Sequence, residues 1–221
     1  MNFARRGICA GAIASFLAGR PIASALAEDE ANELVFSGKA LDRSENPQLD
    51  RAMIQLLKKI TVILRINPGF KYLDDENAFT TQEAIVKGTT GTVFLGVPLL
   101  RRLLGDFSNG GAVIAGVCSH ECGHIYQYQY DQMSRLKRNE GLLFVELHAD
   151  FLAGYCLNRL KIGSPGDLSE FFNTDYARFN PDNRGTHQQR TDALNKGFSA
   201  ANDGQPIGIA ADAGRAFVMS L

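Results

Sequence analysis

Residues 112 to 124 combine two properties that few segments can satisfy together. The first seven, 112 to 118, are almost entirely apolar, and the last five read His-Glu-Cys-Gly-His. A segment that is apolar on nearly all sides favours a helix buried in the core. Two histidines and a glutamate on such a helix need partners, because burying an unpaired polar group costs free energy.

The spacing of these polar residues suggests what the partner is. His120 and His124 are four residues apart, so on a helix they share one face and can bind the same Zn2+ ion. Glu121 stands beside them, as the general base does in the H-E-x-x-H pattern of zinc peptidases. Gln127 falls on the same face one turn further on. The alternative is an amphipathic helix whose two histidines are hydrogen-bonded without a metal.

A catalytic zinc ion takes three protein ligands and keeps one position open for water. Residues 142 to 152 form a second apolar segment and contain Glu146 and Asp150, which predicts a second buried helix. Glu146 is the predicted third ligand. Asp150 lies one turn later on the same face, where it can accept the free N–H of a ligating histidine. The alternative for both acids is a buried ion pair with an arginine such as Arg159 or Arg184.

His148 competes with Glu146 for the role of third ligand. It is two residues from Glu146, about half a helical turn, so the two side chains cannot share a face. We therefore predict a histidine on the surface of the helix.

Taken in order, several segments resemble the gluzincin metallopeptidases, close to the soluble minimal members of the HtpX and CAAX-prenyl protease family. The similarity covers roughly residues 60 to 200. Its strong elements are the helix around residues 120 to 124, the segment Glu146-x-x-Ala149-Asp150, and Gly185-Thr186-His187 leading to Arg190. Weaker matches are Asn77-Ala78-Phe79 and the segment from Gly91 to Leu95.

The resemblance implies a role for each matching residue. His120, His124 and Glu146 would bind one zinc ion per chain, and Glu121 would be the general base. Asp150 would accept a hydrogen bond from a ligating histidine without binding the metal itself. The fold implied is a zincin-like single domain.

His187 resembles a position that faces the active site in this family, which would make it a second catalytic residue. The alternative is a purely structural role at the start of a helix. Thr186 can cap that helix, expected over residues 187 to 198. On it, Arg190 can pair with Asp150 or with the region of Glu140.

Segments before residue 100 predict the rest of an α+β fold. Residues 47 to 60 have the apolar spacing of an amphipathic helix with Pro47 in its first turn. Residues 61 to 66, 83 to 87 and 92 to 95 are expected to be strands. They predict a small antiparallel sheet packed on the two ligand-bearing helices. By resemblance, Thr92 to Gly96 would be an edge strand that binds substrate by strand addition, or else an ordinary paired strand.

The first 27 residues read as a signal peptide. Arg5-Arg6 precede thirteen uncharged residues, 7 to 19, and Ala25-Leu26-Ala27 offers a cleavage site. The apolar part is too short for a spanning helix, which needs about 20 residues. The paired arginines indicate the twin-arginine route. We therefore expect export to the periplasm or beyond, with residues 28 to 221 forming one metallopeptidase domain.

The remaining composition narrows the partners. No stripe of basic residues with interleaved aromatics is present, so nucleic acid is not an expected partner. No stretch of the mature chain predicts a transmembrane segment. Cys118, Cys122 and Cys156 are expected to be inert buried thiols, with a bridge from Cys156 to one of the others as the alternative.

The predicted function is zinc-dependent hydrolysis of peptide bonds in a peptide or protein substrate, by a metalloendopeptidase. Two other functions stay open. One is a zinc-stabilised scaffold or chaperone, although a closed structural zinc site would need a fourth protein ligand. The other is a zinc amidase acting on cell-wall peptides.

Overall fold

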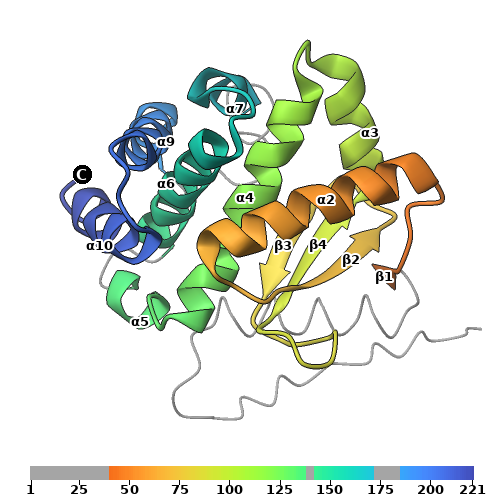
Figure 1. Ribbon diagram of the computed structural model, residues 1–221, viewed down its shortest axis with the longest axis horizontal. Helices are drawn as coiled ribbons and strands as arrows, with labels where there is room; N and C mark the ends of the chain where they lie inside the picture. Colours follow the sequence, from red (N-terminus) through yellow and green to blue (C-terminus); the bar gives the residue numbers. More distant parts are fainter. Residues whose placement is uncertain (1–39, 138–141, 172–184) are drawn as a thin grey trace, which may run out of the picture.

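The computed structural model describes residues 40–137, 142–171 and 185–221 (Figure 1). The predicted signal peptide lies outside these residues. The described part is α+β, as predicted, with a four-stranded sheet and eight helices. In chain order the elements are β1 (Ala40–Leu41), α2 (Pro47–Leu64), β2 (Gly69–Leu73), β3 (Ala78–Thr81), β4 (Thr92–Gly96), α3 (Val97–Asp106), α4 (Gly110–Gln129), α5 (Met133–Leu136), α6 (Leu143–Leu160), α7 (Pro165–Phe171), α9 (His187–Asn202) and α10 (Ile207–Val218).

Helix α2 begins where the sequence predicted and ends one turn later. The Asn46 side chain accepts hydrogen bonds from two backbone N–H groups of the first turn, and Pro47 follows it. The strand predicted over residues 61 to 66 is wrong, because these residues continue the helix. Ile60 and Leu64 are buried and Val62 is 77% exposed, so the helical period outweighs the β propensity of the branched residues.

The sheet is mixed, so the prediction of an antiparallel sheet is wrong. The strand order is β1-β2-β4-β3, with β2 and β4 parallel and the two outer pairs antiparallel. Strand β4 forms as predicted, but it lies in the centre of the sheet rather than at its edge. Each of its five residues is buried, as expected for a central strand. The outer strand next to β4 is β3. Residues 83 to 87, predicted as a strand, belong to the connection from β3 to β4.

Helices α4 and α6 carry the residues singled out in the sequence, and both are buried over most of their surface, as predicted. Figure 1 shows α4 between the sheet and a layer formed by α6, α9 and α10. The sheet packs mainly on α4, through β3 and β4, rather than on both helices as expected. Among the described helices, none combines the length and the apolar character needed to cross a bilayer.

The tight contact between α4 and α6 depends on a small residue inside the His-Glu-Cys-Gly-His segment. A Cβ atom at Gly123 would lie 3.2 Å from the Cα atom of Ala149. Because no side chain separates the backbones there, residues one turn away on both helices are brought within reach of one another.

The three described cysteines, Cys118, Cys122 and Cys156, are buried and free. Burial raises the pKa of each thiol above its ordinary value, so none is poised to react at neutral pH. The prediction of inert thiols is confirmed, and the alternative of a bridge is not.

Candidate metal centre

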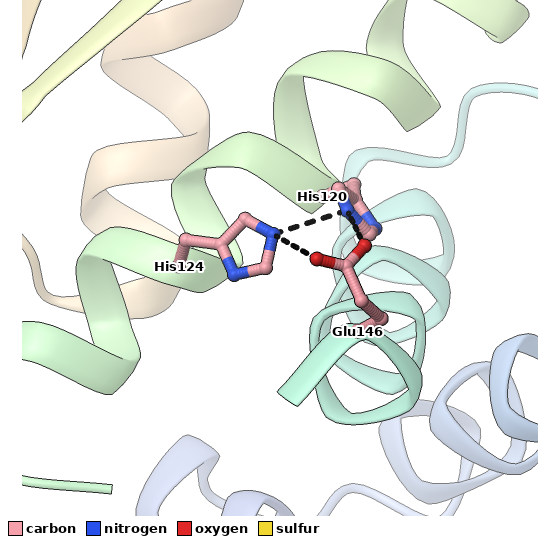
Figure 2. Close-up of side chains that lie close together, drawn as sticks. All are labelled: His120, His124 and Glu146. Atoms are coloured by element: carbon pink, nitrogen blue, oxygen red, sulfur yellow. Dashed lines mark hydrogen bonds and ion pairs between the residues drawn. The ribbon is translucent and has the colours of Figure 1, made fainter. Parts of the chain in front are cut away.

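Three side chains from two helices meet at the contact between α4 and α6. Figure 2 shows the rings of His120 and His124 and the carboxylate of Glu146 pointing toward a common space. The two Nε2 atoms are 3.2 Å apart. One oxygen of Glu146 is 3.5 Å from Nε2 of His120 and the other is 3.8 Å from Nε2 of His124. All three side chains are buried.

These distances fit a metal ion. Two ligand atoms at about 2.0–2.1 Å from a tetrahedral zinc ion are separated by about 3.3 Å. The separation of the two Nε2 atoms is close to that value, and the carboxylate oxygen nearest to each histidine, at 3.5 and 3.8 Å, is a few tenths of an ångström beyond it. Two imidazoles and a carboxylate suit zinc and several other transition-metal ions. The three side chains can therefore hold a metal ion, as the sequence predicted.

The outer nitrogen of His120 is held by a buried ion pair. Nδ1 of His120 lies 2.8 Å from Oδ1 of Asp150, and Arg190 of α9 donates to both oxygens of Asp150 at 2.7 and 2.8 Å. The predicted contact between Asp150 and a histidine of the pair is present. Of the two partners left open for Arg190, the contact with Asp150 is present, and Glu140 lies outside the described residues.

The surroundings of His120 favour a positive charge at its ring. Burial alone lowers the pKa of His120, but the hydrogen bond and charge of Asp150, with contributions from Glu146 and Glu121, raise it to about 9. Its Nε2 atom lies 3.2 Å from the Nε2 atom of His124. Two lone pairs facing each other at this distance repel, so a proton or a metal ion between them is stabilising.

The outer nitrogen of His124 is held in a different way. Its Nδ1 atom lies 2.9 Å from Oε1 of Gln127, one turn along α4. Gln127 in turn donates from Nε2 to the backbone carbonyl of Val145 at 2.7 Å, across the contact to α6. The sequence placed Gln127 on the metal face of the helix, but its partners depend on how the two helices meet.

Glu121, the predicted general base, is buried beside the centre and is fixed by a residue of the sheet. Thr80 of β3 donates from Oγ1 to Oε2 of Glu121 at 2.8 Å and lies 3.1 Å from its backbone oxygen. Sequence reasoning missed Thr80, because 41 residues separate it from Glu121 and no local spacing connects them.

His148 is buried, so its prediction as a surface histidine is wrong. Helix α10 covers this face of α6, and Nε2 of His148 lies 3.0 Å from the backbone oxygen of Ala211. Its Nδ1 atom is 3.3 Å from Nε2 of Gln127. Burial lowers the pKa of His148 to about 4, which keeps its ring neutral at physiological pH. As expected, it is not part of the metal-binding group.

His187 does not belong to the group of potential ligands either. Its Nε2 atom is 2.9 Å from the hydroxyl of Ser169 in α7, and the ring stands at the start of α9. Thr186 caps that helix, as predicted, in a reciprocal arrangement with Gln189. The contacts of His187 thus favour the structural alternative, and its catalytic role stays a prediction.

Comparison with known proteins adds no relative. The chain matches no family model, and the searches of curated proteins and of solved structures found no match.

Proposed function

We propose that this protein is an exported zinc metalloendopeptidase of the gluzincin type, with a zincin-like domain over residues 28 to 221. The observation that carries the proposal is the convergence of His120, His124 and Glu146 on one point with Glu121 beside it. A purely structural zinc site would need a fourth protein ligand and would leave the buried Glu121 without a task. The resemblance to the HtpX and CAAX-prenyl protease family supports the same assignment.

In this proposal, metal binding and proton transfer are assigned to different residues. His120, His124 and Glu146 would hold the zinc ion. When bound, zinc would lower the pKa of a coordinated water to about 7 and would polarise the scissile carbonyl group. Glu121 accepts a proton from the attacking water and delivers it to the nitrogen of the leaving amine. Thr80 donates to Oε2 of Glu121, and we assign the proton transfer to the other oxygen, Oε1.

The sheet offers a place for an extended substrate next to this base. Strand β3 pairs with β4 on one side and is the last strand of the described sheet on the other. An extended peptide can join such an edge through backbone hydrogen bonds. Because Thr80 of β3 is bonded to Glu121, a peptide added there would run close to the base. We therefore assign substrate binding to β3 instead of β4.

The proposal is tested with mature protein expressed beside its Glu121→Gln variant. We expect both to bind one zinc ion per chain, and only the unchanged protein to cleave casein or a peptide library. A chelator should abolish cleavage and added Zn2+ should restore it. Glutamine keeps the size and the hydrogen bond from Thr80 but cannot accept a proton, so we expect turnover to fall by at least about 100-fold.

Normal cleavage by Glu121→Gln would show that the assigned base is wrong. Tight zinc binding without cleavage of any peptide would indicate a zinc-stabilised scaffold. Activity confined to peptidoglycan would indicate an amidase.

A further inference from the structure

Gln127 links the two helices that carry the candidate ligands. Its Oε1 atom faces Nδ1 of His124 on α4, and its Nε2 atom faces the carbonyl of Val145 on α6, directly before Glu146. The same Nε2 atom also faces His148, which reaches the backbone of α10. We infer that Gln127 is a positioning residue, which fixes His124 as a metal ligand through a buried chain of hydrogen bonds. This inference deepens the proposed metal site and rests on it.

The direction of each hydrogen bond follows from the two ends of the chain. Backbone carbonyl groups can only accept, so Nε2 of His148 must donate to Ala211. A neutral ring with its proton on Nε2 has a lone pair on Nδ1, and this lone pair faces Nε2 of Gln127. The carbonyl of Val145 faces the same nitrogen. Both hydrogens of the amide group therefore have an acceptor, and its orientation is determined.

With the amide nitrogen turned toward α6, the amide oxygen must face His124. An amide oxygen can only accept, so Nδ1 of His124 carries the proton. Its Nε2 atom then presents a lone pair toward His120 and Glu146, as a metal ligand must. The tautomer of His124 is thus set by backbone carbonyl groups on two other helices.

The two histidines are supported by groups of different charge. Asp150 supports His120 with a carboxylate whose charge is balanced by Arg190, whereas Gln127 supports His124 with a neutral amide. Neither support adds an unbalanced negative charge to a buried site that already contains Glu146. A carboxylate at position 127 would have no such balance and could not donate to Val145.

The first test is the affinity for zinc of a Gln127→Met variant, measured by competition with a chromophoric chelator. Methionine has nearly the same length but neither donates nor accepts in this way. We expect zinc binding about 10 to 100-fold weaker, the usual effect of losing a group that orients a ligand. Gln129→Met is the matched control, because Gln129 lies on the same helix and its contacts are with Arg65 and Asn67. We expect it to bind zinc as the unchanged protein does.

The second test requires no substitution. Long-range 15N–1H spectra of the histidines in the zinc-loaded protein should show the proton of His124 on Nδ1 and that of His148 on Nε2. A proton on Nδ1 of His148, or a folded Gln127→Met variant that binds zinc within about twofold of the unchanged protein, would overturn the inference. Both readouts are independent of peptide cleavage. If both results were as expected but the protein cleaved no peptide, the proposed peptidase activity would be rejected and the role of Gln127 would be retained.

Discussion

Around the candidate metal centre, Thr80 contacts the side chain of Glu121 and Gln127 contacts that of His124. For Thr80 we predict an effect on turnover alone. Thr80→Val keeps the shape but removes the hydroxyl donor from Glu121, and a hydrogen bond to a charged group contributes about 1.5–3 kcal/mol. We expect kcat to fall by about tenfold or more, with zinc content and KM unchanged, in steady-state cleavage of a peptide.

Thr80→Ser is the control, because serine supplies the same donor, and it should retain most of the activity. If Thr80→Val turned over as fast as the unchanged protein, the hydrogen bond would have no part in catalysis.

At the scale of single residues, the sequence predicts which side chains share one face of a helix. His120, His124 and the pair Glu146 and Asp150 each share a face at a spacing of four residues, which local periodicity determines. Thr80 and the choice of Asp150 for Arg190 depend on contacts 41 and 40 residues apart, which no local pattern encodes.

At the scale of the elements, the contact between α6 and α9 depends on glycine. A Cβ atom at Gly197 would lie 1.8 Å from the backbone oxygen of Phe151, so alanine there must force the helices apart. We predict that Gly197→Ala costs about 3 kcal/mol of unfolding free energy in denaturant titrations. In Gly208→Ala, the control on α10, the new Cβ atom would meet nothing within 4 Å, and stability should hold or rise slightly. Equal stability of the two variants would contradict this account.

The elements also show where periodicity is a reliable guide. The buried faces of α2, α4 and α6 were predicted because apolar residues recur at helical spacing or fill the whole helix. The sequence did not predict the end of α2. Thr61 and Val62 are residue types that favour strands, but in the structure they continue the helix. The sheet was predicted as present but not in its order. Which strand lies at the edge is decided by pairing between residues distant in the chain.

For the whole molecule, a metal ion bound at the candidate centre would couple metal binding to stability and to pH. The pKa of His120 in the metal-free protein is raised from 6.5 to about 9, so its protonation stabilises the fold below pH 6.5. This contribution is lost as pH rises through 9. Zinc bound to His120 would displace that proton, so zinc binding would strengthen over the same pH interval. We predict that the difference in Tm between zinc-loaded and metal-free protein widens from pH 6.5 to 9.

Calorimetry of both forms across this range measures the effect. At a free zinc concentration of 100 Kd the gain in stability is about 2.7 kcal/mol. A difference in Tm that narrows with rising pH would show that the proton and the ion do not compete for His120.

Arg190 of α9 and the Ala211 carbonyl of α10 both follow the last candidate ligand, Glu146, in the chain. Arg190 binds Asp150, which contacts His120, and Ala211 binds His148, which contacts Gln127, the partner of His124. A chain that ended before residue 187 would still possess the full set of ligands and the base. It would lack the groups on α9 and α10 that fix the orientation of the two histidine rings. Possession of the short histidine signature is therefore a weaker sign of a working centre than the signature together with the helices that follow it.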